Sequence, residues 1–117
     1  MPEDRKIDYL ELPASDLAAT KAFYMDAFGW QFVDYGPDYC AFNDGRLDGG
    51  FYRSELRAST ANGSVLVVLY ATDLEETEAR VRAHGGQILK EIFSFPGGRR
   101  FQFADPHGNE LAVWSER

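Results

Sequence analysis

Two segments of this 117-residue chain repeat one pattern, and the repeat restricts the possible folds more than any other feature of the sequence. The first segment, SDLAATKAFYMDAFG, runs from Ser15 to Gly29, and the second, TDLEETEARVRAHGG, runs from Thr72 to Gly86. Matching residues lie 57 positions apart, an Asp-Leu pair stands near the start of both segments, and a glycine closes both. A chain of this length forms one compact domain, so the repeat predicts two similar halves that share a core.

Each repeated segment has the features of an amphipathic helix. Ser15 and Thr72 are the predicted N-cap residues, and Thr72 with Glu75 has the spacing of a capping box. Apolar and small residues recur inside both segments at intervals of three and four positions, which is the spacing of one helix face. Gly29 and the pair Gly85-Gly86 are predicted to end the helices in a left-handed C-cap conformation.

Short segments rich in apolar, aromatic and β-branched residues surround both predicted helices, as is typical of strands. One precedes each helix and three follow it, at 6–12, 30–36, 38–44 and 47–53, and again at 64–70, 87–93, 99–105 and 109–116. The order is therefore βαβββ twice. We expect an α+β fold, with one domain over 1–117 that consists of a module at 5–53, a polar linker at 54–63 and a module at 64–116.

Composition narrows the possible partners and location. The net charge of −7 repels a phosphate backbone, so we expect no nucleic-acid partner. No apolar run is long enough to span a membrane, and the charged N-terminal residues do not resemble a signal peptide. Cys40 is the only cysteine, which excludes an internal disulfide. These features predict a cytoplasmic protein with no membrane partner.

The sequence also resembles a known group of proteins. Residues 11–32, ELPASDLAATKAFYMDAFGWQF, and 103–116, FADPHGNELAVWSE, are similar to the vicinal oxygen chelate superfamily. That superfamily includes glyoxalase I, bleomycin-resistance proteins and extradiol dioxygenases. The resemblance covers nearly the whole chain and implies paired βαβββ modules whose sheets form an open, curved barrel around a cleft. It also implies a homodimer.

Metal-dependent members of the superfamily use His, Gln or Glu ligands on the first and last strands of each module. The resemblance places those positions at Tyr9, Phe51, Leu66 or Val67, and Ala112. None of these is a usual metal ligand, whereas a catalytic divalent site needs about three protein nitrogen or oxygen ligands. We therefore expect no metal site and no cofactor, with a divalent metal held by other residues as the alternative.

Two carboxylates are candidates for catalytic bases or weak cation ligands. Glu11 and Glu110 each lie two positions from a ligand position of the superfamily, and hence on the same strand face. Solvated or arginine-paired carboxylates at the cleft rim are the simpler interpretation. His84 and His107 are expected to be exposed, at the end of a helix and in a turn respectively.

The remaining candidates concern ligand binding. A hairpin at 93–100 carries adjacent arginines, of which strand alternation directs one toward the cleft and the other away. Aromatic residues on the predicted elements either fill the cleft or form the walls of a pocket. The expected ligand-binding residues are Tyr9, Trp30, Phe51, Arg100, Phe103, Ala112 and Trp114.

Three functions remain open at this point. The first is binding of a small aromatic or apolar molecule without a metal. The second is a glyoxalase-like lyase or a dioxygenase that uses unconventional or metal-free catalytic residues. The third is a structural or regulatory protein that keeps the fold without a ligand.

Overall fold

The computed structural model describes residues 2–117, and the predicted βαβββ order is present in both halves. The first half consists of β1 (Tyr9–Ala14), α1 (Leu17–Phe28), β2 (Gln31–Asp34), β3 (Tyr39–Asn43) and β4 (Asp48–Arg53). The second half consists of β5 (Val67–Tyr70), α2 (Leu74–Ala83), β6 (Gln87–Phe95), β7 (Gly98–Ala104) and β8 (Glu110–Ser115). A short 3-10 helix, η1 (Thr60–Asn62), lies between them.

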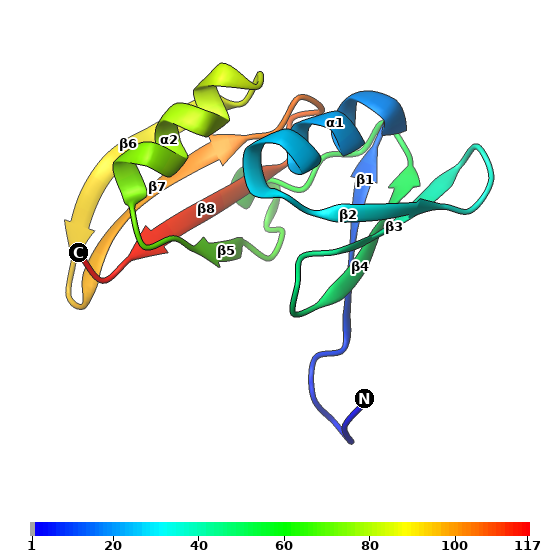
Figure 1. Cartoon of the computed structure of the whole chain (residues 1–117), viewed down its shortest axis with the longest axis horizontal. Coiled ribbons are helices and arrows are strands. Elements are labelled where there is room, and N and C mark those ends of the chain that lie inside the picture. The colour runs from blue at the N-terminus through cyan, green and yellow to red at the C-terminus, as the bar shows by residue number, and fades with distance from the viewer. Residues whose placement is uncertain (1) are drawn as a thin grey trace.

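The strands form two four-stranded mixed sheets with the same topology. The strand orders are β1-β4-β3-β2 and β5-β8-β7-β6, and in each sheet the first strand pairs in parallel with the last. The other pairs are antiparallel. Figure 1 shows α1 and α2 on the same side of the molecule, above the two sheets. This arrangement confirms the α+β fold with paired modules, although the described strands do not close into a barrel.

Both helices begin one residue later than the sequence suggested. The N-cap residues are Asp16 and Asp73, whose carboxylates each accept a hydrogen bond of 3.0 Å from the backbone N–H three positions on. The prediction of Ser15 and Thr72 was therefore wrong, because an aspartate carboxylate caps each helix instead. Gly29 has φ 76°, which confirms the left-handed C-cap of α1.

An aromatic core fills the space between α1 and its sheet. The ring of Tyr24 stacks on Trp30 at 4.5 Å between centroids, and Trp30 stacks on Phe42 at the same distance. Phe51 lies 5.3 Å from Tyr24 and is fully buried. Large apolar areas removed from water make such a cluster a main source of stability.

None of the described helices is long and apolar enough to cross a membrane.

The turn before β8 joins the two modules. Asp105, almost completely buried, accepts a 2.8 Å hydrogen bond from the Tyr24 hydroxyl of α1 and three more from backbone N–H groups of its own turn. The Asn109 side-chain amide donates to the Pro13 carbonyl at 2.6 Å. The buried side chains of Asp105 and Asn109 therefore have hydrogen-bond partners, as buried polar groups require.

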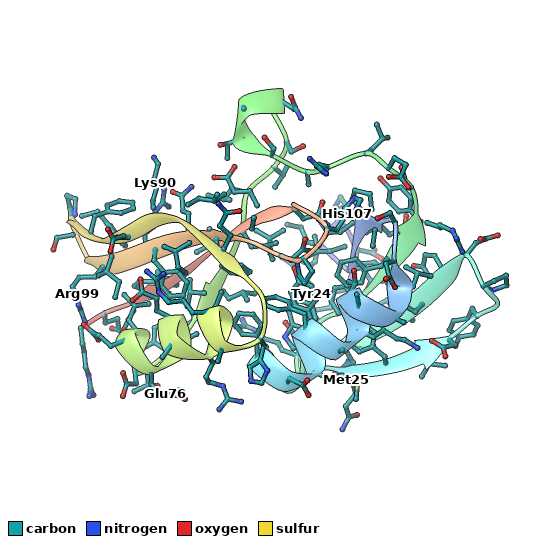
Figure 2. The ribbon with its side chains drawn as sticks, turned by 90° about the horizontal axis from the view of Figure 1, so that it is seen from above. Tyr24, Met25, Glu76, Lys90, Arg99 and His107 are labelled. Atoms are coloured by element: carbon teal, nitrogen blue, oxygen red, sulfur yellow. The ribbon has the colours of Figure 1, made fainter. Side chains whose placement is uncertain are left out.

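His107 belongs to the same joint. Its Nδ1 accepts from the backbone N–H of Ser15 at 3.1 Å, so Nε2 carries the proton and donates to the Leu56 carbonyl at 2.6 Å. The prediction of an exposed turn histidine was wrong for His107, which is only 9% exposed, whereas His84 is exposed as expected. The imidazole is buried because the turn folds back onto the start of α1, as Figure 2 indicates.

Candidate functional site

Each sheet has one face against its α-helix and one face that neither α-helix of the described residues covers. In β1 the side chains of Leu10 and Leu12 pack into the core, so Tyr9 and Glu11 point to the opposite side. We call the uncovered side of the β1–β4 sheet the first open face. The corresponding side of the β5–β8 sheet, opposite α2, is the second open face, and Figure 2 shows Lys90 projecting from it.

A hydrogen-bonded chain of two phenols and a carboxylate lies on the first open face. The hydroxyl oxygens of Tyr9 and Tyr39 are 2.6 Å apart, and Tyr39 donates to Glu11 Oε2 at 2.9 Å. Because an ionised carboxylate only accepts, the donors run from Tyr9 to Tyr39 to Glu11. Burial, followed by the hydrogen bonds with Tyr9 and Glu11, raises the pKa of Tyr39 well above its usual range. Tyr39 therefore stays a neutral donor.

Gly50 makes room for this chain. It stands opposite Glu11 in the β1–β4 register, and a Cβ atom at this position would collide with the Tyr39 ring and hydroxyl. The absence of a side chain lets Tyr39 lie across β4 and reach the carboxylate on β1.

A groove of about 630 Å³ lies beside β1, and Tyr9 and Glu11 are among the residues that line it. Its other walls come from β4, from the segment that links the modules and from the start of the second module. Leu56 in the linker and Val65 at the start of the second module are 69% and 83% exposed, which is high for apolar side chains. The volume lies within the range of small-molecule sites. Its lining includes Tyr9, Glu11, Tyr52, Leu56, Arg57, Asn62 and Val65.

Glu110 is fully occupied as a structural acceptor on the second open face. Its Oε1 accepts from the Thr60 N–H and hydroxyl at 2.9 and 2.8 Å, and its Oε2 accepts from the Gln102 amide at 2.6 Å. Burial alone would raise the pKa of Glu110, but the hydrogen bonds from Thr60 and Gln102 outweigh it and lower the pKa. Glu110 thus holds η1 against the second sheet. Glu11 belongs to a separate network, so the two carboxylates do not form one hydrogen-bonded pair.

The second open face also carries three of the expected ligand-binding residues. Arg100 and Trp114 are directly opposite each other on β7 and β8, and Ala112 is opposite Gln102. The adjacent Arg99 points to the helix side, where it pairs with Glu75 of α2. The two arginines therefore alternate as expected, although they belong to the regular strand β7 and not to a loop.

Three other expected residues lie away from both open faces. Trp30 is 6% exposed and Phe51 and Phe103 are fully buried, all on the helix side of the sheets. The expectation that Phe51 lines the cleft was wrong, because Phe51 faces the helix side of β4. The residues of β4 that face the open side are Gly50 and Tyr52, one position on either side of Phe51. These aromatic side chains stabilise the core, and only Tyr9 among the expected aromatic residues lines the groove.

Sequence reasoning missed Tyr39, Tyr52 and the exposed apolar residues of the linker. A signal for Tyr39 was available, because a glycine in the middle of a strand marks a close approach by a neighbouring group. No comparable signal identifies Leu56 or Val65, since their exposure depends on how the two modules sit together.

The residues present do not fit the divalent metal that the resemblance implies. Tyr9 and Ala112 lie on the open faces, whereas Phe51 and Val67 pack toward the core. Within residues 2–117, no three His, Cys, Asp or Glu side chains come close enough together to hold a metal ion. A set of three nitrogen or oxygen ligands is therefore missing at these positions.

Two βαβββ modules with open sheet faces define a class of fold, and comparison with known proteins identifies the family. The family model for the Glyoxalase/Bleomycin resistance protein/Dioxygenase superfamily matches residues 6–113, so the chain belongs to this superfamily. The chain is 31% identical over 124 aligned positions to the anthracycline biosynthesis protein DnrV of Streptomyces peucetius. This alignment covers 91% of the chain and 45% of the relative, so the chain spans about half of that protein's length.

Solved structures share the fold. A glyoxalase-related enzyme from Fulvimarina pelagi superposes with a TM-score of 0.79 at 20% identity, covering 95% of this chain and 88% of that one. Lactoylglutathione lyase from Agrobacterium tumefaciens superposes with a TM-score of 0.72 at 25% identity, covering 97% and 96%. This fold carries several activities, so it does not by itself specify one.

Proposed function

We propose that this protein binds a small, largely aromatic or apolar molecule in the groove beside β1, without a metal cofactor. The observation that carries the proposal is the groove itself, which combines the exposed apolar side chains of Leu56 and Val65 with the polar groups of Tyr9 and Glu11. Removing apolar surface from water contributes roughly 25 cal/mol per Å², and a polar group at one end fixes the orientation of the ligand. The similarity to a protein named for anthracycline biosynthesis supports a flat aromatic ligand.

Glu11 and Arg57 bring charges of both signs to the groove, and the acceptors of Tyr9 and Glu11 favour a cationic group beside them. The Tyr9 oxygen, having donated its proton toward Tyr39, is an acceptor, and Glu11 uses only Oε2 within the described residues. An ammonium group is attracted to both, and the net charge of −7 attracts it from a distance. We therefore propose an aromatic amine as the class of ligand.

We also propose that the protein is a homodimer that works in the cytoplasm. The open faces carry exposed apolar side chains, among them Val33, Val68 and Tyr70, at 57%, 42% and 50% exposure. The outer strands of each sheet are unpaired along one edge within the chain. Exposed apolar area and free strand edges both favour association. Light scattering that gives only the monomer mass of 13.2 kDa at micromolar concentration would argue against the dimer.

A glyoxalase-like lyase or dioxygenase activity is the second candidate. The Tyr9–Tyr39–Glu11 chain favours it, because connected hydroxyl and carboxylate groups can accept a proton from a bound substrate. Turnover that is lost in Tyr9→Phe while ligand affinity is retained would support an enzyme over a binding protein.

Thermal unfolding with two matched compounds, one cationic and one neutral, tests the main proposal. We expect a naphthylmethyl ammonium compound to raise Tm more than the neutral alcohol, and the gain to shrink in Glu11→Gln. Glu91→Gln is the matched control, because the Glu91 side chain is 87% exposed on β6 and lies outside the groove. Equal stabilisation of Glu11→Gln and the unmodified protein would contradict the proposed anchor. A Leu56→Arg variant, which places a repelling charge in the groove, that still binds the ammonium compound as well as the unmodified protein would place the ligand outside the groove.

A further inference from the structure

Arg100 is a partly buried cation whose hydrogen-bonding capacity is mostly unused. One hydrogen bond in the structure involves its guanidinium, from Nη2 to the Gln102 side-chain oxygen at 3.1 Å. Its Nε atom is buried without an acceptor. A guanidinium has five N–H donors, and leaving them unpaired away from water costs free energy. Within residues 2–117, Arg100 belongs to no ion pair, although the chain carries an excess of acids.

The surroundings of Arg100 are flat and apolar and carry charges of both signs, because Gln102 links Arg100 to the carboxylate of Glu110. Its guanidinium carbon lies 5.3 Å from the centre of the Phe93 ring, and Trp114 faces it across the sheet. Lys90 Nζ lies 5.9 Å from the centre of the same Phe93 ring, so two cations flank one aromatic group. The carboxylate of Glu110 is taken up by Thr60 and Gln102, so it does not neutralise Arg100 directly.

We propose that the second open face holds a separate binding site for the carboxylate of a small aromatic acid, with Arg100 as its anchor. The unused Nη donors of Arg100 match the two oxygens of a carboxylate, and such charge-assisted pairs are stronger than neutral hydrogen bonds. Phe93 and Trp114 supply the flat walls for the attached ring. Lys90 adds positive charge at the edge of the site.

This site goes beyond the function proposed above. The groove is lined by β1, β4, β5 and the linker, and none of its described residues comes from β6, β7 or β8. The two sites also select opposite charges, since Glu11 favours a cation and Arg100 an anion. Binding at one site can therefore fail without affecting the evidence for the other.

Titration calorimetry on the full chain tests the inference with 2-naphthoate, with its neutral amide and with inorganic phosphate. We expect the unmodified protein to bind 2-naphthoate, and Arg100→Met to weaken that binding by about tenfold or more, as the loss of a charged hydrogen-bond donor should. Arg99→Met is the matched control, because the neighbouring arginine lies on the opposite face and pairs with Glu75. The control should change the affinity by less than about twofold. Arg100→Lys keeps the positive charge, so its affinity for 2-naphthoate should lie between those of the unmodified protein and Arg100→Met.

Several results would overturn the inference. These are the absence of 2-naphthoate binding, equal binding of the amide, and unchanged affinity in Arg100→Met. Phosphate that binds as tightly as 2-naphthoate would show that the rings of Phe93 and Trp114 contribute nothing. If Arg100→Met does not fold, the comparison of naphthoate with its amide on the unmodified protein and on Arg100→Lys still decides the question.

Discussion

The two open faces share one topology but differ in chemistry. Both sheets pair their first and last strands in parallel and pack an apolar face against a helix. The first open face presents acceptors, a phenol oxygen of Tyr9 and the carboxylate of Glu11. The second presents donors, the guanidinium of Arg100 and the ammonium of Lys90. The sheet faces that pack against α1 and α2 are alike because both must bury apolar surface. The two open faces do not have to bury apolar surface against a helix, so their side chains can differ.

The position of the joint explains how the two halves can differ without separating. Asp105 and its turn attach the second module to α1 of the first through buried hydrogen bonds. This joint uses no residue of the Tyr9–Tyr39–Glu11 chain or of the Arg100 site, and it touches the groove through the backbone of Leu56 and Ala58. Changes on the open faces should therefore alter binding more than stability, and changes at the joint should do the reverse.

The largest effect is expected from Asp105→Ala. The substitution leaves the Tyr24 hydroxyl and several backbone N–H groups buried without an acceptor, which should cost about 3–5 kcal/mol in the free energy of unfolding. Urea unfolding measures this change. Asp38→Ala is the control, since Asp38 is exposed and its 3.9 Å contact with Arg53 is a surface pair. Equal losses in both variants would mean that the joint does not hold the modules together.

Gly50→Ala should have the next largest effect and should act on the first open face alone. A methyl group at this position meets the Tyr39 ring and hydroxyl, so Tyr39 must move and its bond to Glu11 must break. Overpacking of this kind costs about 1–3 kcal/mol. Groove binding of the naphthyl ammonium compound should fall, while naphthoate binding on the second face should stay unchanged. Loss of both would show that the two faces are not independent.

Features of the fold and of the candidate site that depend on local sequence patterns could be predicted, whereas features that depend on contacts between distant residues could not. The repeated helix segments and the strand order were predictable, because periodicity and turn residues are local signals. The burial of Phe51 was not, since a shift of one residue exchanges the two faces of a strand. The placement of Arg99 and Arg100 on opposite faces was predictable, because side chains alternate along a strand. The structural role of His107 was not, because its partners Ser15 and Leu56 lie far away in the sequence.

Glu110→Gln should have a smaller effect that depends on pH. The lowered pKa means that the ionised carboxylate stabilises the folded state above the unfolded pKa of about 4.3, and that this contribution is lost as the pH falls through the folded value. At pH 7 the variant should lose about 1 kcal/mol, a value kept low because the group is partly solvated. Urea unfolding from pH 7 to pH 3 should show the difference between the two proteins closing at the acid end. If the difference in free energy of unfolding stayed the same from pH 7 to pH 3, the ionised carboxylate of Glu110 would not be its cause.

The smallest effect is expected from Glu75→Gln, on the helix side of the second module. Arg99 donates to both carboxylate oxygens of Glu75 at 2.6 and 3.1 Å, and these hydrogen bonds lower the pKa of Glu75. Both side chains reach solvent, so water and salt screen the pair and its contribution to stability is small. The small loss of stability should disappear in about 1 M salt, where the Debye length is about 3 Å. Naphthoate binding at Arg100 should be unaffected, because Arg99 and Arg100 project from opposite faces of β7. If Glu75→Gln weakened naphthoate binding as much as Arg100→Met does, the helix side and the open side of this sheet would be coupled, and the separation between the two faces would fail.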